Sequence, residues 1–315
     1  MWFGLTTPSR VPPACPERAV IFWGAFRREP GHARVPDHWY ATSGVFDPSI
    51  EAHYNRDLEC HRLSHDSQLE WVRTQELLER HLPTPPASVL DIGGGPGAYA
   101  AWLAGRGYTV RLIDPVTSDV AEAETTSREQ PDYPFTVALG DARHLEERDA
   151  AYHVVLLMGP LYHLVERSDR LLALGEARRV VRPDGCVVAV GISRFASLLD
   201  GLRSGWLSDP IFSGIAEQDL KNGQHRNPEP DRRPEWFTTA YFHRPDELAE
   251  EAGAAGLLID GVFAIEGPGW LIWRERWGDP DQRAHLLHAA HALEAEPAVL
   301  GTSAHLMVIA HAPAG

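Results

Sequence analysis

Residues 87–97 read ASVLDIGGGPG, a short apolar run followed by a glycine-rich turn. The apolar run predicts a buried strand, and a helix is expected to begin near residue 98. A glycine turn lets the backbone approach a ligand closely, because no Cβ stands in the way. The helix behind the turn presents free N–H groups and the positive end of its dipole to the same place. This stretch therefore predicts a ligand site at the end of a strand in an α/β fold.

Two patterns fit the glycine turn, and they imply different cofactors. Gly93, Gly95 and Ala98 satisfy the G-x-G-x-x-A of dinucleotide-binding folds. Asp91, Gly93, Gly95 and Gly97 satisfy D-x-G-x-G-x-G, which resembles motif I of the class I S-adenosylmethionine (SAM)-dependent methyltransferases. A carboxylate before the glycines suits the ammonium group of SAM and would repel a pyrophosphate, so it favours the second pattern.

The next two predicted strands are each followed by an aspartate. The strand over 108–113 precedes Asp114, about 20 residues past the turn, where a carboxylate can accept both ribose hydroxyls. Dehydrogenases and methyltransferases share this role, so Asp114 does not separate the two cofactors. The strand over 135–139 precedes Asp141 and Ala142, a pair that resembles the adenine motif of the methyltransferases. That resemblance implies that Asp141 accepts from the exocyclic amine and that the backbone N–H of Ala142 reaches a ring nitrogen.

An apolar run over 152–158 predicts a central parallel strand that is buried on both faces. It leads into GPLYHL at 159–164, which resembles a segment found in a subset of small-molecule methyltransferases. In that family the end of this strand faces the transferable methyl group. His163 is therefore the candidate catalytic base or positioning group, and a local structural role is the alternative. Tyr162 is expected to be a wall or hydrogen-bond donor, since the reference pKa of tyrosine is near ~10.

The N-terminal part is expected to cover the site. Residues 1–46 are rich in Pro, Trp and Arg and are expected to be an extension, either poorly ordered or an arm over the pocket or a partner subunit. Apolar residues at helical spacings predict a helical cap over 47–86. In similar enzymes this segment folds over the cofactor, so Tyr54 could contact SAM and Arg62 its carboxylate; a solvated helix face is the alternative. The expected cofactor residues are Tyr54, Arg62, Asp91, Gly93, Gly95, Gly97, Asp114, Pro115, Asp141, Ala142 and Met158.

Strands and helices alternate through the rest of the chain, which predicts an α/β class with a doubly wound, mostly parallel sheet. The resemblance implies seven strands in the order 3-2-1-4-5-7-6, with a late reversed strand, in one methyltransferase domain over 47–313. Residues 193–240 interrupt the alternation after the fifth strand and are expected to form a substrate lid. His225 and His243 flank this lid and are reserve candidates for the base.

The composition of the chain limits the kinds of partner that are expected. The 315-residue chain has a net charge of −15, which argues against a nucleic-acid substrate. Its three cysteines are scattered, so no disulfide framework or zinc spacing follows, and a reducing cytoplasm fits. The 16 histidines include pairs at helical spacing, but none is completed into a recognisable metal site, and no metal is expected. The apolar stretch over 19–26 is too short to span a bilayer.

The sequence thus predicts a cytoplasmic SAM-dependent methyltransferase, monomeric or homodimeric, that produces S-adenosylhomocysteine. Its acceptor is expected to be a small molecule, such as a specialised metabolite or a modified peptide terminus, with no nucleic-acid or membrane partner. The first alternative is an NAD-dependent oxidoreductase, which would bind nicotinamide and not SAM. The second is a catalytically silent relative that binds SAM or a partner as a scaffold.

Overall fold

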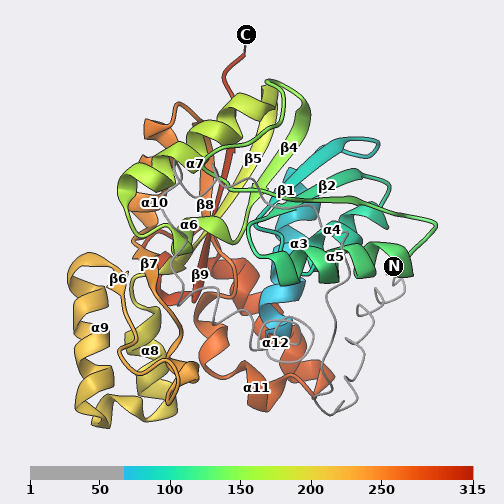
Figure 1. Cartoon of the computed structure of the whole chain (residues 1–315). Coiled ribbons are helices and arrows are strands. Elements are labelled where there is room, and N and C mark those ends of the chain that lie inside the picture. Colours follow the sequence, from blue (N-terminus) through green and yellow to red (C-terminus); the bar gives the residue numbers. More distant parts are fainter. Residues whose placement is uncertain (1–66, 315) are drawn as a thin grey trace, which may run out of the picture.

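The computed structural model describes residues 67–314. The expected extension over 1–46, most of the expected helical cap, and the candidate cofactor residues Tyr54 and Arg62 lie outside the described residues. Within 67–314, one twisted sheet runs through the molecule and helices cover both of its faces (Figure 1).

The sheet has the predicted order. Strand β1 (Ser88–Ile92) pairs in parallel with β2 (Thr109–Asp114) and β4 (Tyr152–Leu157), and β3 (Thr136–Leu139) and β5 (Val181–Ser193) extend the parallel sheet outward. Strand β9 (His305–His311) runs antiparallel beside β5, and β8 (Leu258–Ala264) lies antiparallel on its far side. For the seven strands expected from the sequence, these pairings give the order 3-2-1-4-5-7-6 with a reversed last strand, so the predicted fold is confirmed.

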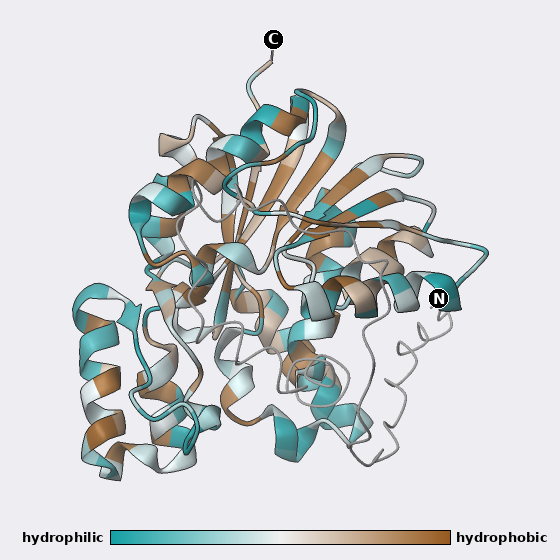
Figure 2. Cartoon of the chain, viewed as in Figure 1, coloured by the Kyte–Doolittle hydropathy of each residue, from teal (hydrophilic) through white to brown (hydrophobic). Residues whose placement is uncertain are grey.

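Helices pack on the two faces because the strands are apolar on both sides (Figure 2). On one face, α3 (Gln68–His81), α4 (Ala98–Ala104) and α5 (Thr117–Glu129) enclose a buried cluster with the sheet. On the other face, α7 (Arg167–Val180) and α10 (Pro245–Ala254) enclose the second large cluster. The helix expected to begin near residue 98 is α4.

Two segments are added at the carboxyl edge of the sheet. The first, residues 194–239, is called the insertion and contains α8 (Ala196–Ser204), η2 (Trp206–Ser208), α9 (Pro210–Asn222), β6 (Gln224–His225) and η3 (Pro234–Trp236). Figure 1 shows it as a separate lobe at the lower left. It coincides with the segment expected to be a lid, although the helices and β6 were not predicted. Its role over a substrate stays a prediction.

The chain returns from the insertion through β7 (Ala240–His243), a strand that the sequence did not predict. Phe242 of β7 pairs in parallel with Ile192 of β5, whose other neighbour is His305 of β9. The last pair between β4 and β5 is Leu157 with Ala189, so β7 takes the place beside β5 that β4 leaves. The insertion is therefore fixed directly beyond the end of β4.

The second added segment joins β8 to β9 and contains η4 (Gly267–Leu271), α11 (Trp273–Arg276), α12 (Pro280–Leu293) and η5 (Leu300–Thr302). Helix α12 begins at Pro280, where the Asp279 side chain caps it by accepting from the N–H groups of Asp281 and Gln282. The segment packs against the start of α3 through Leu69, which shares a buried cluster with Trp273 and Leu286.

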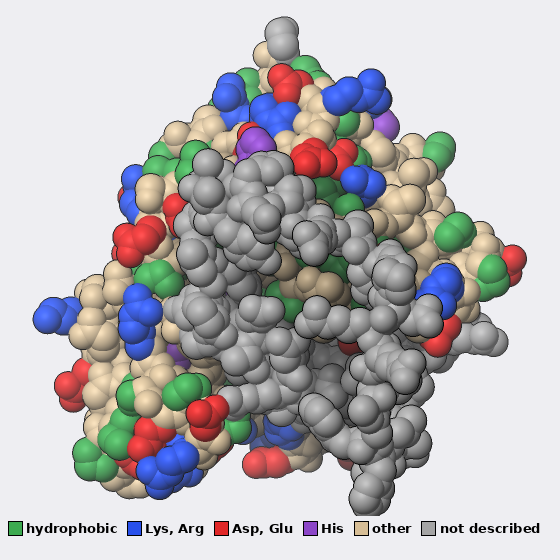
Figure 3. Space-filling view, in the orientation of Figure 1, with side chains coloured by type: hydrophobic (Ala, Val, Ile, Leu, Met, Phe, Trp, Pro, Cys, Tyr) green, Lys and Arg blue, Asp and Glu red, His purple; other side chains and the backbone are tan. Residues whose placement is uncertain are grey.

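The surface of the described residues shows acidic and basic side chains interspersed around the rim of the face in Figure 3. No helix within 67–314 is long and apolar enough to cross a membrane.

Candidate active site

The glycine turn after β1 adopts a conformation that only glycine enters readily. Gly93, Gly95 and Gly97 have φ angles of 69°, 54° and 90°. A Cβ on Gly93 would lie 2.6 Å from a ring carbon of Pro160, whereas a Cβ on Gly95 would meet no atom within 4 Å. The turn is thus closed on the side of β4 and open at Gly95, where a ligand can approach the backbone.

Asp91 lies directly below this turn and is 1% exposed. Its Oδ2 atom has no hydrogen-bond partner among the residues that the structure describes. Burial raises the pKa of the carboxyl group to about 7, and the neighbouring charge of Asp114 adds to the effect. A buried carboxylate without a donor is costly, so the site is complementary to a cationic group.

Asp114 holds the turn in shape from the end of β2. Its Oδ2 accepts from the N–H of Gly95 at 2.9 Å, and its Oδ1 accepts from the N–H of Val116 at 2.8 Å. Burial raises the pKa of this carboxyl group to about 6, although both backbone N–H groups oppose the rise. Each carboxylate oxygen can accept a further hydrogen bond. Pro115 beside it is exposed.

Asp141 has a partner that the sequence analysis did not foresee. Its two carboxylate oxygens face the guanidinium of Arg143, with Nε 3.0 Å from Oδ1 and Nη2 2.6 Å from Oδ2. The same guanidinium donates to Asp169 at 2.9 Å, which ties this loop to the start of α7. Ala142, between the two charged residues, is buried.

The end of β4 touches the glycine turn. A Cβ on Gly159 would lie 2.7 Å from the carbonyl oxygen of Gly93, so both positions need glycine for this approach. Met158, just before it, is partly buried against the cluster under α3 and α4. The chain then forms the one-turn helix α6 (Pro160–His163), which places Tyr162 and His163 at the carboxyl edge.

Tyr162, His163 and Phe237 form an aromatic group next to this turn. The rings of Tyr162 and His163 meet edge to face with centroids 4.7 Å apart, and the Phe237 ring of the insertion lies 6.0 Å from His163. Phe237 has a φ angle of 68°, which is strained for a bulky side chain. Phe237 could not be selected from the sequence, because only the fold brings the insertion to the α6 turn.

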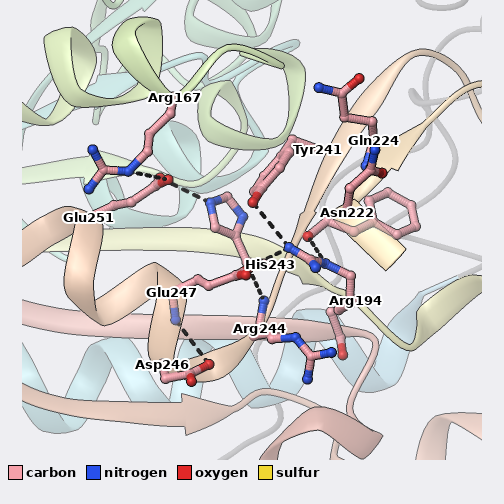
Figure 4. Close-up of polar contacts among 12 residues, drawn as sticks. Arg167, Arg194, Asn222, Gln224, Tyr241, His243, Arg244, Asp246, Glu247 and Glu251 are labelled. Atoms are coloured by element: carbon pink, nitrogen blue, oxygen red, sulfur yellow. Dashed lines mark hydrogen bonds and ion pairs between the residues drawn. The ribbon is translucent and has the colours of Figure 1, made fainter. Parts of the chain in front are cut away.

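The two reserve histidines do not reach this group as free bases. His225 is buried, with Nδ1 2.8 Å from Asp219 Oδ2 and Nε2 2.7 Å from the Trp236 carbonyl oxygen. His243 is fully buried, and its Nε2 lies 3.3 Å from a carboxylate oxygen of Glu251 (Figure 4). Burial lowers the pKa of His243 although Glu251 opposes this effect. Both histidines therefore belong to structural networks.

The structure also brings together a cluster of carboxylate and histidine side chains that the sequence did not predict. Glu70, Glu266 and His305 bring ligand-type atoms within 4.8 Å of one another at the start of β9. Glu266 Oε1 lies 2.6 Å from His305 Nδ1, and its Oε2 accepts from the Ser303 hydroxyl and the His305 N–H. Both oxygens of Glu266 are thus engaged, and the carboxylate orients the histidine ring. The separation of 39 positions between Glu266 and His305 explains why spacing gave no signal.

Comparisons with known proteins agree with this geometry. A family model described as a methyltransferase domain matches residues 89–185, which run from β1 into β5. The ubiquinone biosynthesis O-methyltransferase of Burkholderia thailandensis is 27% identical over 220 residues, covering 70% of this chain and 80% of that protein.

Solved structures share the fold. A SAM-dependent methyltransferase from Methanosarcina mazei superposes with a TM-score of 0.51 at 19% identity, covering 76% of this chain and 98% of the other. One from Mesorhizobium loti gives 0.52 at 15% identity, covering 78% and 99%. The matched domain and the relatives support SAM, not NAD, as the ligand of the glycine turn. Sheet order, glycine turn, matched domain and relatives together make the chain similar to the class I SAM-dependent methyltransferases.

Proposed function

We propose that this enzyme transfers the methyl group of SAM to a small-molecule acceptor at the carboxyl edge of β1 and β4. The observation that carries the cofactor assignment is the buried Oδ2 of Asp91, which has no donor among residues 67–314 and belongs to the strand that leads into the open turn at Gly95. An ammonium group would supply the missing donor and would neutralise the buried charge. Gly95 leaves room for the methionine portion, while Gly93 and Gly97 allow the backbone of the turn its positive φ angles.

The remaining cofactor contacts follow the strand ends. Asp114 keeps one acceptor position on each oxygen for the ribose hydroxyls, while Gly95 and Val116 hold its orientation. Asp141 would accept from the exocyclic amine of adenine, and the N–H of Ala142 would donate to the ring. The contact between Arg143 and Asp141 fixes that carboxylate in place.

When bound, SAM supplies an electrophilic methyl group, and the chain's own residues must align the acceptor with it. Positioning of this kind can contribute roughly 7–11 kcal/mol. His163 would take the proton from an oxygen or nitrogen acceptor as the new bond to carbon forms, or would only position the acceptor. Tyr162 and Phe237 would form the walls against which the acceptor packs.

Two observations support a small-molecule acceptor: two relatives are methyltransferases named for ubiquinone biosynthesis and for demethylmenaquinone, and the insertion places an aromatic ring beside His163. The curated relatives include the ubiquinone enzyme and a demethylmenaquinone methyltransferase of Beutenbergia cavernae, 34% identical over 109 residues, which cover 35% of this chain and 42% of that protein. The insertion brings Phe237 to 6.0 Å from His163, which limits the space beside the α6 turn. The acceptor class that we propose is a specialised metabolite or a modified peptide terminus.

The cofactor assignment is tested by calorimetric titration with S-adenosylhomocysteine, with NAD as the parallel ligand. We expect micromolar binding of S-adenosylhomocysteine and no heat from NAD. Binding of NAD alone would contradict the assignment. Conversion of SAM to S-adenosylhomocysteine across a panel of phenols, amines and carboxylic acids then separates an active enzyme from a silent SAM-binding scaffold.

The role of His163 is tested by His163→Ala and His163→Gln. We expect turnover to fall by about 100-fold or more, in the range for loss of a general base, because no other ring nitrogen in the aromatic group can take the proton. The affinity for S-adenosylhomocysteine should change less than about threefold. His285→Ala, on the exposed side of α12, is the matched control. Wild-type turnover in both His163 variants would rule out the catalytic role.

A further inference from the structure

Arg170 is a buried arginine in the first turn of α7 that no step of the proposed chemistry uses, and it is 1% exposed. Its Nη1 atom donates to the carbonyl oxygens of Leu164 at 2.9 Å and Val165 at 2.7 Å. These carbonyls come directly after His163 in the chain. Arg170 therefore holds the exit of the turn that carries Tyr162 and His163.

The rest of the guanidinium faces two other elements. Nε and Nη2 donate to the two carboxylate oxygens of Glu251 in α10, at 2.8 and 2.7 Å. The guanidinium carbon also lies 3.6 Å from the centre of the Tyr241 ring in β7. One side chain thus joins the α6 turn, α10 and the strand through which the insertion returns.

The network continues from Tyr241 to the point where the insertion leaves the sheet (Figure 4). Arg194 Nη2 donates to the Tyr241 hydroxyl at 3.1 Å and to Glu247 at 2.5 Å, and its Nε donates to the Phe242 carbonyl at 2.7 Å. Both ends of the insertion are therefore locked to the same group of buried charges.

Glu251 stays ionised within this group. Its burial opposes ionisation, but the hydrogen bonds from Arg170 and His243 outweigh burial and hold its pKa at about 2. The pair between Arg170 and Glu251 is bidentate, a geometry that a lysine cannot reproduce while also reaching both carbonyl oxygens.

We propose that Arg170 is a positioning residue of the methyl-transfer site, which sets the place of His163 relative to Phe237 by clamping the α6 turn to β7 and α10. This inference rests on the proposed function of His163. A purely structural role would stabilise α7 and α10 without determining the orientation of the His163 ring.

The test uses Arg170→Lys, which keeps the charge, and Arg170→Met, which removes it. Arg179→Met is the matched control, because Arg179 lies on the same helix and also donates to a carboxylate and to the carbonyls of Leu145 and Glu147. The readouts on the protein loaded with S-adenosylhomocysteine are the ring resonance of His163, assigned with His163→Gln, and hydrogen exchange over 159–166.

In both Arg170 variants we expect the His163 resonance to lose the ring-current shift from Tyr162 and exchange over 159–166 to rise at least tenfold. Affinity for S-adenosylhomocysteine and exchange over β1–β3 should stay within threefold of wild type, and Arg179→Met should leave the His163 resonance unchanged. A wild-type His163 resonance in Arg170→Lys, or an equal change in Arg179→Met, would overturn the inference. Failure of the wild type to bind S-adenosylhomocysteine would instead contradict the proposed function.

Discussion

Asp91→Asn is expected to raise the unfolding temperature of the ligand-free protein above pH 7 while it weakens the binding of S-adenosylhomocysteine. The two effects have one cause, the charge of a carboxylate that is buried without a donor among the described residues. In the free protein this charge is unfavourable, and in the complex an ammonium group would compensate it. The variant thus separates the effect of Asp91 on protein stability from its effect on ligand binding.

The pH dependence has a definite sign. The folded wild type retains the Asp91 proton up to about pH 7, whereas the unfolded chain releases it near the ordinary pKa of 3.8. Stability from this group is fully present below pH 3.8 and is lost as pH rises to about 7. The difference between the folded and unfolded pKa of Asp91 corresponds to at most about 4 kcal/mol of unfolding free energy. Asp91→Asn has no such charge, so this variant does not lose that stability as pH rises. The pKa of Asp114 is also raised, to about 6, so its ionisation lowers the stability of both the wild type and Asp91→Asn as pH rises.

The measurement is thermal unfolding at pH 5, 6.5 and 8 together with calorimetric titration at pH 8. A hydrogen bond to a charged group is worth about 1.5–3 kcal/mol, so affinity should fall by roughly 10- to 100-fold. Asp132→Asn, at an exposed position, is the control that should change neither quantity. Unaltered affinity in Asp91→Asn would contradict the ammonium assignment, and a stability gain that does not grow with pH would contradict the buried charge.

The positions of the candidate cofactor residues at the strand ends could be predicted because their signals are local. Asp91, Asp114 and Asp141 each sit at or just past the end of a predicted strand, and parallel strands bring their carboxyl ends to one edge. The glycine positions follow from the same local geometry, since each has a positive φ or a close neighbour. The pairing of Asp141 with Arg143 was not predicted, because a sequence does not show which acceptor a guanidinium contacts in the fold.

The surroundings of His163 could not be predicted because their contacts join distant segments. Arg170 and Glu251 are 81 residues apart, and neither spacing nor hydrophobic period links them. Strands β6 and β7 have two and four residues, too few for a period-2 pattern to stand out from a polar, proline-rich stretch. The position of Phe237 beside His163 depends on both of these features, so it could only be found in the fold.

His225→Leu is expected to unfold the insertion while leaving the sheet and the cofactor site intact. Asp219 is fully buried, and its Oδ2 accepts from the Ser197 hydroxyl at 2.5 Å and lies 2.8 Å from His225 Nδ1. The His225 ring also stacks on Phe242 with centroids 4.7 Å apart. Removal of the imidazole leaves the buried Asp219 carboxylate with the Ser197 hydroxyl as its one remaining side-chain partner among these residues. We expect this to lower the unfolding free energy of the insertion by about 3–5 kcal/mol.

The insertion has little else to offset that cost, because its own buried cluster consists of Phe212, Ile215 and Trp236 with two partly buried neighbours. We therefore expect faster proteolysis within 205–235 and lower turnover, with binding of S-adenosylhomocysteine retained. Ser197→Ala, which removes one hydrogen bond worth about 1 kcal/mol, is the mild control. Asp219→Asn combined with His225→Leu should recover part of the protection, because it removes the buried charge. Equal cleavage rates in His225→Leu and wild type would show that β7 and the Arg194 contacts alone hold the insertion, and that the buried histidine adds nothing to its stability.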